Sequence, residues 1–333
     1  MRSRWKVTQM TAGLLLLATV FSLVGAYTFS QLSPWPMVLM RRLKEDRNGA
    51  RMNEALQPLV PSGIIIKRNL QYDAEDSDAL LDVYFPSSVR ETKQLLPVVI
   101  WVHGGSWVTG SKDHVANYLK ILASKGFTTV GIDYGLAPSH LYPTPVKNLN
   151  TSLDFIQKNS EDLHADPRRV FLAGDSSGAQ IAAQLANVIS SPSYAKDLHI
   201  APSIERAQLR GVVFHCGVYE ARLANYNREG VLWAYFGTKE FSSDPRLAEF
   251  SVARRVTPEF PPMFISAGND DALSPQSYLF AEVVAKQGVP VDRLFFAQDY
   301  TPAVRHQFQF FLGTDEGQVA LERSVEFLMK RIN

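Results

Sequence analysis

Ser176 lies in a setting that can turn its hydroxyl group into a nucleophile. The stretch from Gly174 to Gly178 (GDSSG) has the form G-x-S-x-G, with the apolar run Val170 to Ala173 before it and a stretch rich in Ala, Ile and Leu after it. This pattern predicts a tight turn between a strand and a helix, with the serine hydroxyl presented at the end of a sheet. The N-terminus of such a helix favours negative charge developing there. A simple glycine-rich turn is the alternative interpretation.

A nucleophilic serine needs a general base, and the base needs a carboxylate that orients it. On turns of this kind both groups follow the serine along the chain. The apolar run Met263 to Ala267 is followed by two adjacent carboxylates, Asp270 and Asp271, and His306 is the only histidine after them. We therefore expect Ser176, Asp271 and His306 to form a catalytic triad, with Asp270 as the alternative acid.

A glycine-rich segment after another apolar run is suited to bind an oxyanion. The run Val98 to Val102 leads directly into the sequence HGGSW at residues 103–107. In acyl transfer the carbonyl oxygen becomes negatively charged, and backbone N–H groups held in place stabilise it. Glycine allows the backbone to approach such an oxygen closely. The residues that we expect to form the oxyanion hole are Gly104, Gly105, Ser106 and Ser177, the last three as N–H donors.

Three further polar residues near these motifs are expected to be structural. His103 precedes the serine along the chain and lies inside the glycine-rich loop, so we expect it to brace that turn. Asp175 is expected to hold the turn around the serine, and Cys216 to be a buried apolar residue. Because Cys216 is the single cysteine and the histidines are scattered, no metal-site spacing is present. We expect no metal and no cofactor.

The elements that must position these residues form an alternating pattern. Pro97 to Val102 is apolar on both faces, as in a parallel sheet covered by helices on both sides. Similar runs lie at 128–132, 170–173, 211–214, 263–267 and 294–297, with helical patterns at 115–124, 178–189, 276–286 and 318–332. The repetition predicts a mostly parallel, doubly wound α/β sheet with helices on both faces. Leu81 to Phe85 and Ile64 to Ile66 are expected to be antiparallel edge strands.

These motifs occur in the order found in a known family. From about residue 95 to 325 the chain resembles the hormone-sensitive-lipase-like branch of the α/β-hydrolases. The sequence HGGSW is similar to the family's HGGG oxyanion motif, and GDSSG to its GDSAG turn. Residues 133–138 (DYGLAP) with 142–145 (YPTP) resemble its DYRLAPE and FPA stretches. Residues 271–273 and 306–308 match the places of its catalytic D-P-L and H-G-F. The departures are Ser106 for Gly, Gly135 for Arg, Ser139 for Glu, and Gln307 for Gly.

The resemblance implies an α/β-hydrolase fold with a small cap, and a carboxylesterase or lipase-like activity. Together with the residues above, it predicts a serine hydrolase that cleaves carboxylic esters with short to medium acyl groups through an acyl-enzyme intermediate. A deacetylase or peptidase on the same fold is an alternative. So is a ligand-binding or scaffold protein without activity, although the presence of His306 argues against it. A small-molecule ester is therefore the expected partner.

The composition of the chain argues against nucleic acid as a partner. The 333 residues carry 34 Lys and Arg against 33 Asp and Glu, a net charge of +1. This balance gives no electrostatic reason to expect nucleic acid. The apolar fraction of 46% is that of an ordinary globular protein large enough to form a substantial core.

The N-terminus has a pattern typical of membrane insertion. Three cations, at Arg2, Arg4 and Lys6, precede an apolar stretch from Val7 to Phe29. About 20 apolar residues suffice to cross a bilayer, and a basic start followed by an apolar core also describes a signal peptide. We expect a membrane anchor that is not cleaved, with the catalytic domain outside the cytoplasm; secretion after signal cleavage is the alternative.

The chain therefore divides into three expected parts. Residues 1–30 form the transmembrane anchor or signal segment, and residues 31–62 a helical neck or part of a cap. Residues 63–333 form the α/β-hydrolase catalytic domain, with a cap insertion at about 219–260 over the active site.

Overall fold

The computed structural model describes residues 19–20, 22, 24–25, 27–221 and 230–332. Most of the apolar stretch between Val7 and Phe29 lies outside these residues, so the expected anchor or signal segment is not described. Within the described residues, no helix has both the length and the apolar character needed to cross a membrane.

A single eight-stranded sheet forms the centre of the molecule, with the strand order β1-β2-β4-β3-β5-β6-β7-β8. From β3 onwards neighbouring strands are parallel, whereas β1 and β2 pair in antiparallel fashion at one edge. The strands are β1 (Ile64–Gln71), β2 (Leu80–Pro86), β3 (Leu96–Val102), β4 (Thr128–Ile132), β5 (Ala165–Asp175), β6 (Leu209–His215), β7 (Met263–Ala267) and β8 (Val291–Phe295). The predicted mostly parallel sheet with antiparallel edge strands is confirmed.

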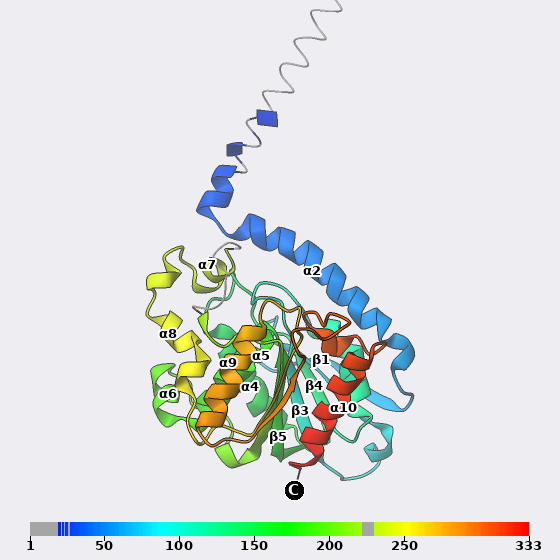
Figure 1. Ribbon diagram of the computed structural model, residues 1–333. Coiled ribbons are helices and arrows are strands. Elements are labelled where there is room, and N and C mark those ends of the chain that lie inside the picture. The colour runs from blue at the N-terminus through cyan, green and yellow to red at the C-terminus, as the bar shows by residue number, and fades with distance from the viewer. Residues whose placement is uncertain (1–18, 21, 23, 26, 222–229, 333) are drawn as a thin grey trace, which may run out of the picture.

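Helices cover both faces of this sheet (Figure 1). The helices are α2 (Trp35–Ala55), α3 (Ala116–Ala123), α4 (Thr144–Lys158), α5 (Ser177–Ser190), α6 (Pro192–Asp197), α7 (Val231–Phe236), α8 (Arg246–Phe250), α9 (Ser274–Lys286) and α10 (Asp315–Met329). Apolar residues of α4, α5 and α9 form one core cluster with the sheet, and those of α3 and α10 form another. Because parallel strands are joined by such crossover helices, both faces of the strands are buried.

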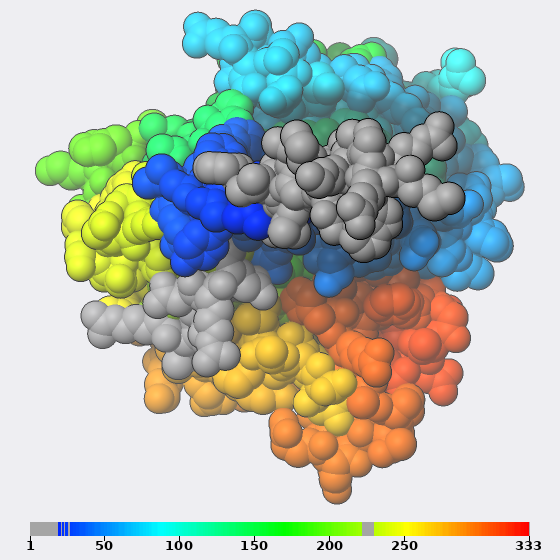
Figure 2. All heavy atoms as spheres, turned by 90° about the horizontal axis from the view of Figure 1, so that it is seen from above, coloured from blue at the N-terminus to red at the C-terminus, as the bar shows by residue number. Residues whose placement is uncertain are grey.

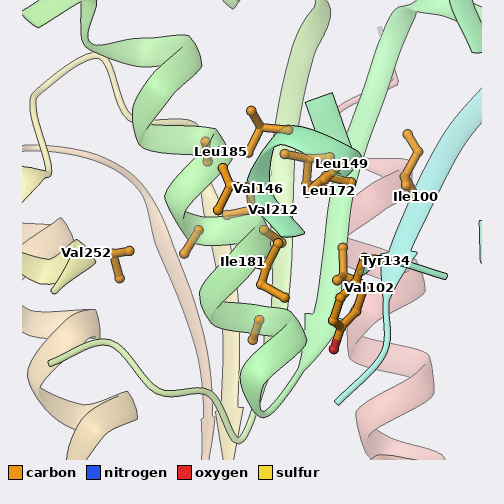
Figure 3. Packing of buried hydrophobic residues seen from close by; sticks show 14 of the residues in the cluster. Ile100, Val102, Tyr134, Val146, Leu149, Leu172, Ile181, Leu185, Val212 and Val252 are labelled. Carbon is orange, nitrogen blue, oxygen red and sulfur yellow. The ribbon is translucent and has the colours of Figure 1, made fainter. Parts of the chain in front are cut away.

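Alternate side chains of the central strands belong to different core clusters. Val98, Ile100 and Val102 of β3 belong to the cluster under α4 and α5, whereas Val99 and Trp101 belong to the cluster under α3 and α10. Successive side chains of a strand point to opposite faces, so a strand buried on both sides is apolar throughout. Figure 3 shows part of the first cluster, with residues of α4 and α5 packed against β3, β5 and β6.

Several strands differ from their predicted bounds, including β1, which continues to Gln71, and β6, which runs over Leu209–His215. The expected strand at 170–173 begins earlier, at Ala165. Its first residues are polar and therefore resemble a loop in the sequence, but Asp166 pairs with Arg169 at 2.7 Å within the strand. The expected strand at 294–297 lies at Val291–Phe295, at the sheet edge, where the strand is only half-buried. Charged residues are tolerated at such an edge, so the apolar pattern there is a poor guide to the bounds.

Helix α2 lies across the end of the sheet at which the parallel strands finish (Figure 1). Seen from above, blue atoms of the N-terminal part and orange atoms of the C-terminal part lie on the same face of the molecule (Figure 2). Pro36 in its first turn suits a helix start, because the missing N–H would have no partner there. The region expected at 31–62 thus contains one long helix beside the loops that carry the candidate catalytic residues.

Candidate active site

Ser176 lies at a sharp turn between β5 and α5. Its backbone has φ +52° and ψ −120°, a conformation that residues with a side chain rarely adopt. A Cβ atom on Gly178 would clash with the carbonyl oxygen of Val102, and one on Gly174 would lie 2.7 Å from the backbone carbon of Gly178. The two glycines therefore allow the helix to start directly against the neighbouring strand, as the G-x-S-x-G pattern predicts.

The pair of Asp271 and His306 is joined by a hydrogen bond. His306 Nδ1 lies 2.8 Å from Asp271 Oδ2, and the Asp271 carboxylate is buried while the His306 side chain is 36% exposed. The other oxygen of the carboxylate accepts a hydrogen bond from the Leu273 N–H at 2.9 Å. A carboxylate held in this way fixes the orientation of the imidazole and stabilises its cation.

The loops after β7 and β8 are bonded to each other, and this brings the pair together. The Val304 N–H donates to Asn269 Oδ1 at 2.8 Å, and the Asp270 N–H donates to the Val304 carbonyl oxygen at 2.9 Å. A side chain on Gly268 would clash with that same carbonyl. The glycine thus permits the close approach that places residue 271 next to residue 306.

The neighbouring carboxylate, Asp270, pairs with Arg305, and no contact with the imidazole is found among the described residues. Its side chain is 59% exposed and lies 3.6 Å from Arg305. Of the two acids that the sequence left open, Asp271 is the one in contact with His306.

The loop after β3 forms the opposite side of the site. Gly104, Gly105 and Ser106 line the same pocket as Ser176, Asp271 and His306. The Gly104 N–H, however, donates to Asp175 Oδ2 at 3.2 Å and is therefore engaged within the protein. The place of Gly104 in the oxyanion hole stays a prediction, with its own N–H bonded to Asp175 in this structure. Within the described part of the chain, the N–H groups of Gly105, Ser106 and Ser177 have no protein acceptor.

Two buried histidines support this region from behind. His103 Nδ1 lies 2.7 Å from the Gly104 carbonyl oxygen, its ring stacks on Tyr134 at 4.4 Å, and burial lowers its pKa to about 4. His215 ends β6, accepts the Ser176 N–H at its carbonyl oxygen at 2.9 Å, and has a pKa lowered by burial to about 3. Both are therefore neutral structural groups at neutral pH.

Two of the departures from the family motif share a backbone conformation. Ser106 has φ +55° and Gln307 has φ +60°, the left-handed region that favours glycine. The family motif has glycine at both positions. This chain has residues with side chains there, for which the left-handed conformation costs about 1 kcal/mol each. At Gly135 this chain has glycine where the family motif has Arg. A Cβ atom there would lie 2.5 Å from the ring of His140.

The pocket that contains these residues has a volume of about 730 Å³. One wall comes from α2, with Arg41, Glu45, Asn48 and Met52, and another comes from Phe310 and Phe311. The sequence placed α2 in a neck or cap but identified none of these residues, because they belong to no motif and their charges suggest a solvated helix face. Of the expected insertion at 219–260, no described residue lines the pocket.

Side chains of α2 attach this wall to the loop after β3. Arg42 donates to the carbonyl oxygens of Val108 at 2.8 Å and Ala137 at 3.2 Å, and Thr109 Oγ1 donates to Asp46 Oδ1 at 2.6 Å. Because Thr109 and Val108 closely follow the expected oxyanion loop, the wall and the loop form one bonded unit.

A metal ion is a poor occupant of this site. Ligand atoms of Cys216, Asp271 and His306 lie within 4.8 Å of one another. The thiol is buried, however, and burial raises its pKa, so it remains protonated, whereas metal binding requires the thiolate. The carboxylate and imidazole are already bonded to each other.

The arrangement provides a strained serine, an oriented imidazole and free backbone donors around one pocket. In the described residues no hydrogen bond joins the Ser176 hydroxyl to His306, a contact that in enzymes without substrate commonly tightens only on binding. Such a set of groups is suited to acyl transfer.

Comparisons with known proteins place the chain among esterases. A family model for the alpha/beta hydrolase fold matches residues 99–309. Carboxylesterase NlhH of Mycobacterium tuberculosis is 29% identical over 261 residues, which cover 73% of this chain and 77% of that protein. Esterase B from Lactobacillus Rhamnosis has a solved structure with a TM-score of 0.75 at 21% identity, covering 90% of this chain and 97% of that one. The solved structure of an esterase of Pyrobaculum calidifontis has a TM-score of 0.69 at 20% identity, covering 89% of this chain and 94% of that one.

Proposed function

The chain belongs to the family of alpha/beta hydrolase fold proteins, and we propose that this carboxylic ester hydrolase acts through Ser176 as nucleophile, His306 as general base and Asp271 as orienting acid. The membership confirms the resemblance predicted from the motifs. The observation that carries the assignment is the 2.8 Å contact between Asp271 and His306 in the pocket of the strained serine.

The reaction proceeds in two steps. His306 takes the proton of the Ser176 hydroxyl as its oxygen attacks the ester carbonyl, and Asp271 stabilises the imidazolium that forms. The N–H groups of Gly105, Ser106 and Ser177 stabilise the oxyanion. His306 then gives its proton to the leaving alcohol. Water, activated by the same imidazole, releases the acid from the acyl-enzyme.

We propose short to medium acyl groups as the substrates of this pocket. Its volume of about 730 Å³ must hold both the acyl group and the alcohol. Ligand sites commonly measure about 300 to 1,000 Å³, which suits a small ester. The similar esterase B was solved inhibited by a tributyrin phosphonate, a compound with four-carbon groups.

The test is hydrolysis of p-nitrophenyl esters from acetate to palmitate by the full chain, beside Ser176→Ala. We expect hydrolysis that is strongest for the shorter esters and falls at least about a thousandfold in the variant. A folded wild-type protein that hydrolyses none of the esters and is not labelled by a fluorophosphonate would refute the proposal.

A separate proposal concerns the N-terminal apolar stretch. We propose that it anchors the chain in a bilayer, with the catalytic domain outside the cytoplasm. Support comes from its length and composition, and from the Phe29 and Leu32 side chains, which are 53% and 76% exposed where the chain approaches α2. Retention in carbonate-washed membranes, with an intact N-terminus by mass spectrometry, is expected. A mature protein that begins near Tyr27 would instead identify a cleaved signal.

A further inference from the structure

The carboxylate of Asp175 connects three segments of the active site. It accepts hydrogen bonds from Trp101 Nε1 in β3 at 2.9 Å, from the Gly104 N–H in the oxyanion loop at 3.2 Å, and from Gln307 Nε2 at 2.5 Å. The residue is 1% exposed and directly precedes Ser176. Its third donor, Gln307, directly follows His306. The hydrogen bond between the Gln307 and Asp175 side chains therefore links the turn that carries the nucleophile to the loop that carries the base.

Gln307 is held in place at its backbone as well as at its side chain. Its N–H group lies 3.3 Å from Cys216 Sγ, and its φ is +60°. A residue other than glycine costs about 1 kcal/mol in this conformation. Glycine would avoid the cost but would have no side chain to reach Asp175. The strained conformation and the short side-chain bond are thus two independent observations on the same residue.

We propose that Gln307 is a positioning residue whose side-chain amide, bonded to Asp175, holds the His306 loop in register with Ser176. The proposal rests on the proposed function, because it assumes that Ser176 and His306 act together. The amide touches neither reacting atom, so its effect is on geometry. Misplacement of reacting groups by about 1 Å can cost a hundredfold in rate.

The charge on Asp175 determines how the contact can be tested. The ionisable groups that face it are Tyr118 of α3, Tyr134 after β4, Cys216 after β6 and His306 after β8. Burial raises the pKa of Asp175, whereas its three N–H donors stabilise the ionised form. In Gln307→Glu two carboxyl groups would share this space and would titrate as a coupled pair.

The pair in Gln307→Glu has a pH dependence of known sign. At low pH a shared proton lets one carboxyl donate to the other, so the contact resembles that of the amide. As the pH rises the proton is lost, and two anions repel each other across the contact. The ratio of kcat in the variant to kcat in the wild type should therefore fall as the pH rises, by about 10-fold or more over the range in which the protein stays folded. A merely structural defect would lower the ratio equally at every pH.

Two matched variants complete the experiment. Gln307→Gly removes the amide while relieving the backbone strain, and we expect kcat to fall about 10-fold to 100-fold with KM changed less than about 2-fold. Gln298→Glu makes the same charge change at an exposed position on the same loop, and its ratio to wild type should be constant with pH. All variants are compared on one short p-nitrophenyl ester, with thermal melts as the check on folding.

The outcomes separate this inference from the proposed function. Wild-type activity with an unchanged kcat in Gln307→Gly, or a pH-independent ratio in Gln307→Glu, would overturn the positioning role and leave the triad intact. A wild-type protein that is neither active nor labelled by a fluorophosphonate would instead refute the triad. If Gln307→Glu does not fold, the kcat and KM of Gln307→Gly decide the question.

Discussion

Asp175 and Asp271 are two buried carboxylates that line the same pocket, and they differ in what they bind. Asp175 is surrounded by groups that cannot take its proton, namely the indole N–H of Trp101, the Gly104 N–H and the Gln307 amide. Asp271 contacts a titratable imidazole, that of His306, which is partly exposed to the pocket. Burial is similar for the two, at 1% and 7% exposed. The partner therefore separates the two roles: a carboxylate bound by amides fixes structure, and one bound by an imidazole can orient a base.

Asp271→Asn should produce the largest effect on activity. The amide cannot stabilise the imidazolium and favours the wrong tautomer of His306, so we expect kcat to fall about 10⁴-fold. The free energy of unfolding should fall by less than about 2 kcal/mol, because the change removes little more than one hydrogen bond. Steady-state kinetics and urea denaturation measure the two effects. A loss of less than about 10-fold in kcat would contradict the difference in role between Asp271 and Asp175.

Asp175→Asn should affect stability more than Asp271→Asn does. The new NH₂ group would replace one of the two acceptor oxygens, so either the Trp101 indole or both the Gly104 N–H and the Gln307 amide would lose their acceptor. We expect the free energy of unfolding to fall by about 2–4 kcal/mol. Urea denaturation of both variants under one set of conditions tests the order. Equal losses of stability would mean that the partners do not distinguish the two carboxylates.

Acidification should act on the protein through two buried histidines, His103 and His215. The folded protein binds protons at the buried pair only near pKa values of about 4 and about 3, below the ordinary 6.5. The unfolded chain therefore binds more protons, and stability is lost as the pH falls below the unfolded pKa. At about pH 5 each buried histidine should cost about 2 kcal/mol relative to neutral pH.

This loss can be assigned by substitution. Urea denaturation at both pH values should give a smaller difference for His215→Gln than for wild type. An unaltered pH dependence in His215→Gln would contradict the assignment.

Asp270→Asn should have the smallest effect. Its carboxylate is exposed and lies 3.6 Å from an exposed Arg305 side chain, a pair that contributes little in water. We expect kcat and KM within about 2-fold of wild type. A loss comparable to that of Asp271→Asn would return Asp270 to the role of orienting acid.

Much of the fold is visible in the sequence because buried parallel strands are apolar on both faces. Val98 to Val102 and Met263 to Ala267 illustrate this, and the polar residues directly after such runs meet at one edge of the sheet. Ser176, Asp271 and His306 could be chosen for this reason. Where charged residues pair with each other locally, as Asp166 and Arg169 do at the start of β5, the apolar pattern does not reveal the strand.

The parts of the site that the sequence does not reveal depend on contacts between distant residues. The partner of the Gly104 N–H lies 71 positions away, at Asp175, so the sequence could not show that this donor is engaged. The Gln307 amide reaches a residue 132 positions earlier. Its only sequence signal is the departure from glycine in the family motif. The wall from α2 has no signal, since its charged residues resemble an ordinary solvated helix.

Helix α2 also bears on the order in which the site is completed during synthesis. It leaves the ribosome early, yet the carbonyl groups that Arg42 binds lie 66 and 95 residues later in the chain. Domains fold while the chain is being made, from the N-terminus onwards. The helix must therefore wait until β3 and β4 have emerged before it can dock. His306, which follows β8, emerges later still, so the wall of the pocket can be in place before the base arrives.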